Sequence, residues 1–214
     1  MALSSDEIQD ILRIDSELNK IRDYDFLLER ILREARRVVN ADAGSIYIKE
    51  NDKLAIKYAQ NDTIQKRLKP GEKQIYTIFT IPINEQTISG YVALTGKALS
   101  IADVYKISKK APYKYNSWYD KEAGYRTKSM LTVPLKTQEG KILGVIQIIN
   151  ALDEKGKIIP FTKDDEIIVT HFAANATVAL QRAYMTRSMI IRMIRMAELR
   201  DPKETGAHVN RVAG

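Results

Sequence analysis

The sequence has no cysteine, one tryptophan and two histidines among its 214 residues. Without cysteine the chain has no disulfide framework, thiol nucleophile, thioether-linked chromophore or cysteine-ligated cluster. Two histidines, His171 and His208, are few for a metalloenzyme centre contained within the chain. These absences direct attention away from catalysis and toward binding or regulation.

Long apolar runs and a secretory leader are also missing. No apolar stretch approaches the roughly 18–20 residues that span a bilayer. The first residues, MALSSDE, do not place a cationic segment before an apolar one. With 44% hydrophobic and 29% charged residues, the composition is that of a soluble globular protein. We therefore expect a cytoplasmic chain without a membrane partner.

Basic residues exceed acidic ones, giving a formal net charge of +7. They fall mainly in residues 106–128 and in a late helical stretch, residues 182–200. Neither stretch carries a nucleic-acid-binding motif, and scattered surface charge needs no polyanionic partner. We interpret both as solvated faces and predict no nucleic acid partner.

Helical periodicity is found at both ends of the chain. Ser4 and Glu7 form a capping box before an amphipathic pattern, which predicts a helix over residues 5–22. Asp25 is the expected cap of a second helix that runs to Val39. Thr162 is the expected cap of a final helix that extends to about residue 200. Such a helix is longer than the domain that precedes it, so a paired helix from a second subunit is expected to cover its far end.

Alternating polarity predicts six strands between the helices. The expected strands are residues 45–49, 54–58, 79–83, 98–101, 129–136 and 143–149. Pro82 places the third strand at a sheet edge, and a short helix over residues 88–95 is expected between Thr87 and Gly96. The order of elements predicts an α+β fold with antiparallel hairpins.

Residues 104–127, the lid segment, have little regular period and contain six aromatic side chains among lysines. A structureless stretch of this length inside a domain is uncommon and tends to be functional. Tyrosine and tryptophan can stack on a planar ring, and they can equally well pack a loop onto a sheet. Both interpretations of the lid segment stay open.

Residues 23–181 resemble a GAF domain. The likeness rests on the order and spacing of residues 41–47 (ADAGSIY), 58–62 (YAQND), 88–96 (ISGYVALTG), 125–131 (YRTKSML) and 134–150 (PL…VIQIIN). The resemblance implies a GAF-like six-stranded antiparallel sheet flanked by helices, with a long C-terminal signalling helix. It also implies a pocket for a small-molecule effector, such as a nucleotide, between the sheet and the lid segment.

Candidate ligand-binding residues follow from that pocket position. They are the polar and aromatic side chains expected near the lid or at strand ends, namely Tyr58, Gln60, Asn61, Tyr91, Tyr105, Tyr125, Arg126, Thr127, Ser129 and Gln147. A turn stabilised by its own side chains is an equally good interpretation of residues 60–62.

Many cyclic-nucleotide-binding GAF domains carry an Asn-Lys…Phe-x-x-x-Asp-Glu signature. Asn150, Phe161, Asp165 and Glu166 match it, but Ala151 replaces the lysine. We therefore interpret Asp165 as a helix cap and Phe161 as a core residue. His171 is interpreted as a packed, neutral histidine rather than a haem ligand.

The last residues, 199–212, resemble the start of an HD-GYP domain, a family of bacterial metal-dependent phosphodiesterases that open cyclic di-GMP. Glu204 and His208 match its Glu-Thr-Gly-x-His motif and would ligate divalent metal, Fe or Mn, in a complete domain. The His-Asp pair and Gly-Tyr-Pro segment that define the activity are absent. This chain is thus expected to be neither an enzyme nor a holder of a cofactor.

The chain is accordingly divided into an N-terminal helix (1–22), a GAF sensor domain (23–181), a linking helix (182–200) and the first part of an HD-GYP domain (201–214). The expected function is a sensor that controls the phosphodiesterase through a homodimer formed by the N- and C-terminal helices. A ligand-free dimerisation and spacer module is the alternative. The reductases of the GAF family depend on cysteines, which argues against an enzyme.

Overall fold

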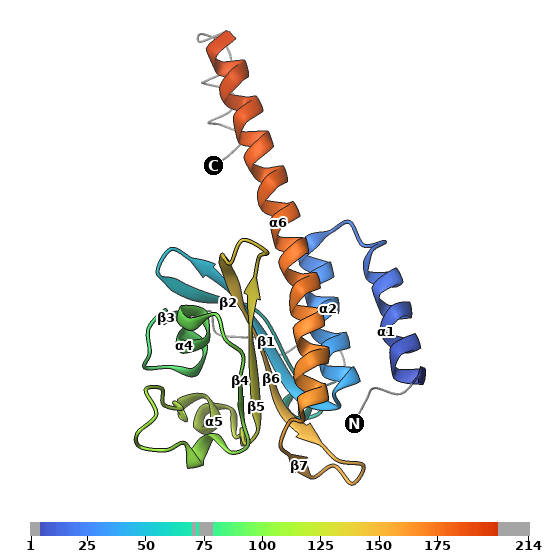
Figure 1. Ribbon diagram of the computed structural model, residues 1–214, viewed down its shortest axis with the longest axis vertical. Coiled ribbons are helices and arrows are strands. Elements are labelled where there is room, and N and C mark those ends of the chain that lie inside the picture. The colour runs from blue at the N-terminus through green and yellow to red at the C-terminus, as the bar shows by residue number, and fades with distance from the viewer. Residues whose placement is uncertain (1–4, 70–71, 73–78, 201–214) are drawn as a thin grey trace. The chain divides into compact units, whose positions relative to one another are not determined.

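An antiparallel sheet forms the centre of the fold in the computed structural model, which describes residues 5–69, 72 and 79–200 (Figure 1). Six strands lie in the order β3-β2-β1-β6-β5-β4, and a short strand β7 pairs with β6. The predicted α+β fold with a six-stranded antiparallel sheet is confirmed, and β7 is an addition. The chain divides into two compact units, Met1–Val178 and Ala179–Gly214.

The β1–β2 hairpin supplies half of the sheet. β1 spans Ala41–Glu50 and β2 spans Lys53–Asn61, with Asn51 in the left-handed region at φ 57° in the turn. β1 begins four residues before the predicted start. A bulge beside Ile46 and Tyr47 shifts the register, so that Ile46 faces Tyr58 and Tyr47 faces Ile56. The bulge therefore decides which β2 side chains share a face with Tyr47.

The β5–β6 hairpin supplies the other half, as predicted. β5 spans Met130–Lys136 and β6 spans Ile142–Leu152, and β6 pairs with both β5 and β1. β4 (Leu99–Ile101) and β3 (Thr80–Pro82) are the two ends of the strand order. The predicted edge position of Pro82 is confirmed. β7 (Ile158–Ile159) has only two residues, too few for a recognisable alternation.

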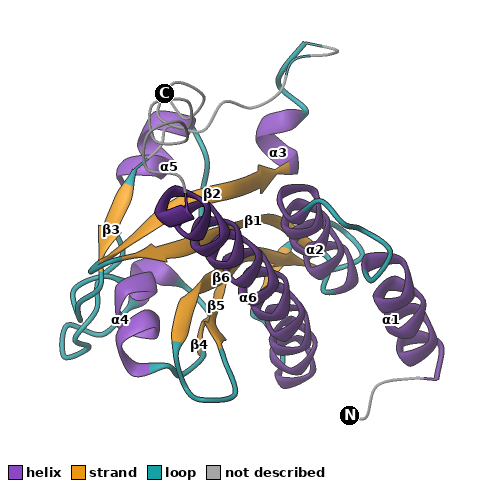
Figure 2. Ribbon diagram, turned by 90° about the horizontal axis from the view of Figure 1, so that it is seen from above, coloured by secondary structure: helices purple, strands orange, loops and turns teal. Residues whose placement is uncertain are grey.

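Helices cover both faces of the sheet (Figure 2). α2 (Tyr24–Val38) and residues 163–178 of α6 lie on one face, where Leu28, Ile31 and Phe172 are fully buried. The predicted α2 cap, Asp25, is wrong: Asp23 accepts from the Phe26 N–H at 2.8 Å. Asp25 instead accepts from the Tyr58 hydroxyl of β2.

α4 (Ile88–Thr95) lies on the opposite face and matches its prediction at both ends. Thr87 Oγ1 accepts from the Gly90 N–H at 3.0 Å, and Gly96 ends the helix at φ 62°. A Cβ atom at Gly90 would lie 2.5 Å from the Pro82 carbonyl oxygen, so only glycine allows α4 to approach β3 this closely.

The lid segment is more regular than predicted. It contains the 3₁₀ helix η1 (Val104–Lys106) and the helix α5 (Trp118–Ala123), which ends at Gly124 with φ 55°. A third short helix, α3 (Asp62–Gln65), follows β2. These helices have three, four and six residues, less than two turns each, so they are too short to repeat a hydrophobic stripe, which is why periodicity missed all three.

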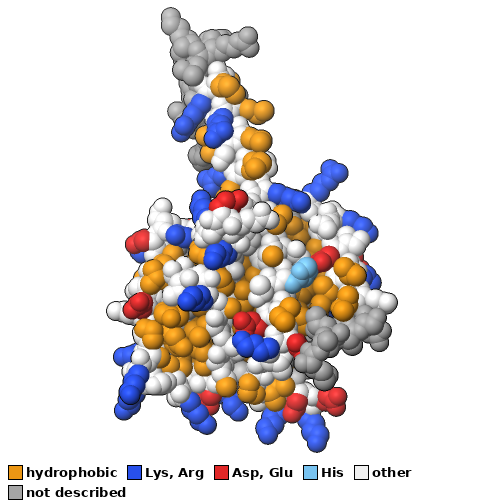
Figure 3. All heavy atoms as spheres, in the orientation of Figure 1, with side chains coloured by type: hydrophobic (Ala, Val, Ile, Leu, Met, Phe, Trp, Pro, Cys, Tyr) orange, Lys and Arg blue, Asp and Glu red, His pale blue; other side chains and the backbone are white. Residues whose placement is uncertain are grey.

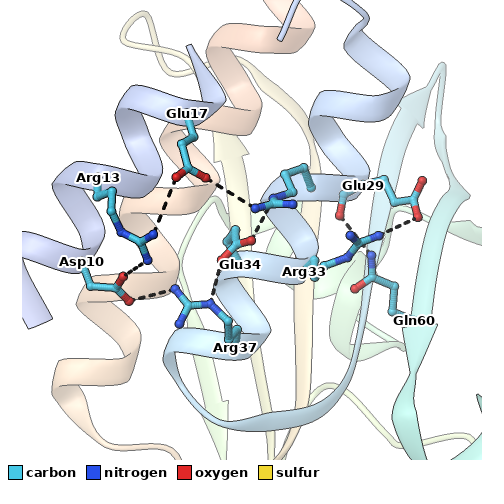
Figure 4. A network of polar contacts seen from close by, with 9 residues as sticks. Asp10, Arg13, Glu17, Glu29, Arg33, Glu34, Arg37 and Gln60 are labelled. Carbon is cyan, nitrogen blue, oxygen red and sulfur yellow. Dashed lines mark hydrogen bonds and ion pairs between the residues drawn. The ribbon is translucent and has the colours of Figure 1, made fainter. Parts of the chain in front are cut away.

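α1 (Ser5–Leu18) ends four residues before the predicted limit. It buries Ile14 and Leu18 and is joined to α2 by a polar network (Figure 4). The buried Glu34 accepts from Arg30 and Arg37, each at 2.8 Å, and Arg37 also contacts Asp10 of α1 at 2.8 Å. Charge pairing therefore supplements a small apolar contact in holding α1.

His171 of α6 also contacts α1. Its Nε2 lies 2.9 Å from the Asp15 carboxylate, and its side chain is 42% exposed. Asn175 donates to the same carboxylate at 2.9 Å. The His171 ring is thus packed against α1 and Phe172 but only partly buried, and its carboxylate partner on α1 is one that the periodicity of α6 alone could not reveal.

α6 (Lys163–Arg200) begins with the predicted capping box. Thr162 Oγ1 accepts from the Asp165 N–H at 3.1 Å, and the Asp165 carboxylate accepts from the Thr162 N–H at 2.7 Å. From residue 184 on, many apolar side chains are exposed and interspersed with arginines (Figure 3). In the part of the chain that the structure describes, no helix is both long and apolar enough to cross a membrane.

Candidate functional site

A cavity of about 1080 Å³ lies against the sheet face opposite α2. β1, β2 and β6 supply its floor, and α4, α5 and the lid segment supply its walls. Its volume is at the upper end of the range for small-molecule sites, which is about 300–1,000 Å³. The buried residues of its lining are Ala43, Gly44, Ser45, Tyr47, Ile56, Asn61, Ile88, Ser89, Tyr125, Thr127, Met130 and Gln147.

Gln147 is the polar residue at the centre of the floor. Its side chain donates to Ser89 Oγ of α4 and to Thr132 Oγ1 of β5, both at 3.1 Å. The residue is 6% exposed and Ser89 is 4% exposed. Both amide N–H groups are used in these bonds, which leaves the carbonyl oxygen of Gln147 as the remaining polar atom of the amide.

Tyr125 joins the end of the lid segment to the sheet. Its hydroxyl donates to the buried Asp42 carboxylate at 2.7 Å and accepts from Asn150 Nδ2 at 2.9 Å. Asn150 also donates to the Arg126 carbonyl at 2.8 Å and accepts from the Lys128 N–H at 2.7 Å. Burial, together with the Asp42 carboxylate, raises the pKa of Tyr125 far above its ordinary value.

Asp120 organises the middle of the lid segment. It is buried on α5 and accepts from the Thr127 N–H at 2.9 Å and the Thr127 hydroxyl at 2.8 Å. The Tyr105 hydroxyl donates to it at 2.7 Å, and the Arg126 guanidinium lies 3.7 Å from the Tyr105 ring centroid. These contacts fix α5 against the strand that follows it.

Aromatic side chains give the cavity much of its wall. Tyr115, Trp118 and Tyr119 of the lid segment line it together with Tyr47 and Phe79. Burial raises the pKa of Tyr47 to about 12 and also raises that of Tyr115. Such rings offer flat apolar surface to a planar ligand.

Five of the ten predicted site residues line the cavity: Gln60, Asn61, Tyr125, Thr127 and Gln147. The Gln60 amide is bonded to α2, where it accepts from Arg36 at 2.9 Å and donates to the Glu29 carbonyl at 3.0 Å. Asn61 Oδ1 caps α3 by accepting from the Ile64 N–H at 2.9 Å. The side chains of Tyr125, Thr127 and Gln147 belong to the cavity wall or floor, and Asn61 lines the cavity beside α3.

The other five predicted residues lie outside the lining. Tyr58 is on the α2 side of the sheet, opposite Ile46, because the register shift leaves Lys57 of β2 without a partner and puts Tyr58 and Ile56 on different faces. Tyr91 packs against Tyr113 at a ring distance of 5.0 Å, and Ser129 accepts from the Ala151 N–H at 3.2 Å. Tyr105 and Arg126 lie behind the wall, in the contacts with Asp120 described above.

Several lining residues were not among the predicted site residues. Ser45 and Tyr47 alternate along β1 and point toward the cavity, a face that strand alternation alone could have indicated. Ser89 lies two residues after the predicted cap of α4. Tyr115 and Trp118 belong to the lid segment, whose short helix was not foreseen.

The cyclic-nucleotide signature residues have structural roles here. Asp165 caps α6 and Phe161 is buried, so both of these interpretations are confirmed. Asn150 holds the end of the lid segment at a left-handed φ of 58°. Glu204 and His208 lie outside the described residues.

Comparison with known proteins agrees with this architecture. The family model for the GAF domain matches residues 23–180, and the chain belongs to the GAF domain family. It is similar in fold to the GAF domain of the Acinetobacter phosphoenolpyruvate-protein phosphotransferase, with a TM-score of 0.63 and 15% identity over 87% of this chain and 99% of that one. The A. aeolicus nlh2 GAF domain in an inactive state has a TM-score of 0.60 and 17% identity, covering 83% and 96% of the two chains.

The curated relatives are longer proteins. The dual 3′,5′-cyclic-AMP and -GMP phosphodiesterase 11A of Takifugu rubripes is 34% identical over 98 residues, 46% of this chain and 10% of the relative. The probable 3′,5′-cyclic phosphodiesterase pde-5 of Caenorhabditis elegans is 28% identical over 175 residues, 78% of this chain and 22% of the relative. The matches thus span about a tenth to a fifth of these relatives. GAF domains are small-molecule-sensing or regulatory modules, and this chain contains one.

Proposed function

We propose that this chain is the input module of a bacterial signalling protein and that its cavity binds a small planar effector of the purine class, with or without a phosphate. The cavity beneath the lid segment is the observation that carries the proposal. It combines aromatic walls with a few fixed polar groups, which is the usual composition of a small-molecule site. The names of the related phosphodiesterases support a purine-type ligand.

The output is proposed to be an HD-GYP phosphodiesterase that follows α6. The resemblance of residues 199–212 to the start of that family supports this assignment. Glu204 and His208 would then ligate divalent metal, Fe or Mn, together with residues of the complete domain. A ligand would change the output only to the extent that it binds two arrangements of the sensor with different affinity.

The lid segment is the part of the sensor best placed to report occupancy. It contributes Tyr115, Trp118 and Tyr125 to the cavity and is tied to β1 through Asp42. The Asp42 carbonyl accepts from Arg36 of α2 at 2.6 Å. Contacts therefore run without interruption from the cavity wall to a helix on the opposite face of the sheet.

Native mass spectrometry of the purified protein tests whether a ligand is bound. We expect a co-purifying small molecule that is lost on unfolding. The variant Ala59→Tyr places a ring in the cavity lining and should reduce its retention at least tenfold. Lys57→Tyr adds the same ring at an exposed position two residues earlier on β2 and should retain the ligand.

The alternative is a ligand-free module that pairs and spaces the domains of the full protein. Absence of any bound molecule, together with unchanged thermal stability on addition of purine nucleosides and nucleotides, would establish that alternative. Equal retention in the two tyrosine variants would move the ligand site away from this cavity.

A further inference from the structure

We propose that the cavity selects an uncharged heteroaromatic ligand rich in N–H groups, such as a nucleobase or nucleoside, over a nucleotide that carries a phosphate. This inference rests on the proposed function, because it takes the cavity as the effector site. It goes further by assigning the charge and the hydrogen-bonding character of the effector.

The first observation concerns charge. Among the described lining residues, the strongly buried polar side chains are all neutral: Ser45, Tyr47, Asn61, Ser89, Tyr125, Thr127 and Gln147. The charged lining residues that the structure describes are Glu72, Lys114 and Glu122, and all three are exposed. A phosphate moved from water into this interior would lose its hydration without meeting a buried cation, which is strongly unfavourable.

The second observation concerns the hydroxyl groups of the wall. The Tyr125 hydroxyl donates its proton to Asp42, and the Thr127 hydroxyl donates its proton to Asp120. A hydroxyl group has one proton, so toward a ligand both oxygens are limited to accepting. The Asp42 and Asp120 carboxylates keep both hydroxyl protons turned away from a ligand, because a hydrogen bond to a charged acceptor is stronger than one to a neutral acceptor.

Charges of the opposite sign near these carboxylates lie away from the lining. Arg36 contacts the Asp42 carbonyl and the Asp62 carboxylate from the α2 side of the sheet, and Arg126 lies over the Tyr105 ring. Neither arginine is among the residues that line the cavity. The two arginines lie near the Asp42 and Asp120 carboxylates, outside the cavity lining, and form no direct ion pair with a ligand.

Gln147 in the floor of the cavity also offers a ligand a hydrogen-bond acceptor. Gln147 uses its two N–H groups on Ser89 and Thr132, so its carbonyl oxygen is the atom left for a ligand. At the start of α4, the Gly90 N–H is already bonded to Thr87 Oγ1. Tyr125 and Thr127 in the wall and Gln147 in the floor thus present acceptors, which match the N–H groups of a nucleobase and oppose the acceptor-only oxygens of a phosphate.

Matched pairs of probes test the inference on the intact chain. Adenosine is compared with 3′,5′-cyclic AMP, and guanosine with 3′,5′-cyclic GMP, by calorimetry. Trp118, the only tryptophan and a lining residue, gives an independent fluorescence signal. For at least one pair we expect the nucleoside to bind about tenfold or more tightly than its cyclic nucleotide.

Salt dependence and one variant sharpen the test. Nucleoside affinity should change less than about twofold between low and high salt, because no ion pair is screened. Lys114→Gln should leave it equally unchanged. If both cyclic nucleotides bind as tightly as their nucleosides, or if the binding of either falls with Lys114→Gln, the inference is overturned while the sensor function stays intact.

Failure of the proposed function has a different signature. If none of the four probes binds and native mass spectrometry finds no retained molecule, the sensor function and this inference both fall. If the retained molecule is an anion, only the inference falls.

Discussion

Tyr47 shows how burial sets the chemistry of a single residue. It is 5% exposed on the cavity side of β1, opposite Ile56 of β2, and burial raises its pKa to about 12. The phenol is therefore held neutral well beyond the pH at which a free tyrosine ionises. Its contribution to the free energy of unfolding therefore falls at alkaline pH.

Because the pKa of Tyr47 is higher in the folded than in the unfolded state, its contribution to stability is fully present below the unfolded pKa of about 10. That contribution is lost as the pH rises through the folded pKa. We expect the free energy of unfolding to fall by roughly 2–3 kcal/mol between pH 10 and 12 through Tyr47. Urea unfolding across this range measures it. Tyr47→Phe should remove that part of the slope, and an unchanged slope would contradict the assignment.

Asn150 combines backbone conformation with side-chain bonding. It is 1% exposed, has φ 58° and makes three side-chain bonds to residues 125, 126 and 128. Asparagine tolerates the left-handed region better than most residues, and its amide can both donate and accept. No other side chain of this size meets both needs.

Two substitutions at this position separate the contributions. Asn150→Gly keeps the φ value and loses the bonds, and should lower the free energy of unfolding by about 2–4 kcal/mol. Asn150→Ala loses both and should cost about 1 kcal/mol more. Chemical denaturation gives both numbers. Equal stability of the two variants would mean that the left-handed conformation is not strained.

At the scale of elements, α1 is held differently from the sheet helices. It lies outside the residues matched by the GAF family and docks on α2 and α6 through Ile14, Leu18 and charged groups. Glu34 is the centre of the network because it is buried and contacts two arginines (Figure 4). Glu29 offers a comparison, since its pair with Arg33 is exposed and 3.4 Å long.

Glu34→Gln should therefore lower the free energy of unfolding by about 1–2 kcal/mol, because two arginines lose a buried partner. Glu29→Gln should change it by about 0.5 kcal/mol or less. Hydrogen exchange of the α1 amides should accelerate in the first variant alone. Similar exchange in both variants would show that apolar contacts suffice to hold α1.

For the whole molecule, the predicted homodimer is best tested in the second unit. Residues 184–196 expose Tyr184, four methionines and three isoleucines. Exposed apolar side chains of this number on one helix favour a protein partner, and a second copy is the simplest. The N-terminal helix, the other predicted contact, has exposed Ile8 and Leu12.

Ile191→Glu should weaken self-association at least tenfold, because it places a charge among the apolar side chains of this helix. Thr186→Glu introduces the same charge at an exposed polar position and should have little effect. Light scattering over a concentration series measures both, with a chain ending at Arg182 as the reference for a lost interface. A dimer that persists in that shorter chain would place the interface on α1 or the sheet.

Local patterns predicted most of the elements correctly. Thr87 with Gly96, Thr162 with Asp165, and the alternation of the strands depend on contacts within a few residues, so they can be read from the chain alone. The same holds for the antiparallel hairpins and the edge position of Pro82. The short helices of the lid segment and β7 were missed because each is too short to repeat its pattern of apolar residues twice.

The sequence by itself therefore determined the family, the antiparallel α+β architecture and the region that covers the pocket, since these depend on short-range order. Tertiary structure decided which side chains enter the cavity. The bulge at Lys57 of β2 placed Tyr58 on the α2 side, the Arg36 and Glu29 contacts engaged Gln60, and the buried carboxylates of Asp42 and Asp120 fixed the hydroxyls of Tyr125 and Thr127. Each outcome joins residues distant in sequence, which no local pattern records.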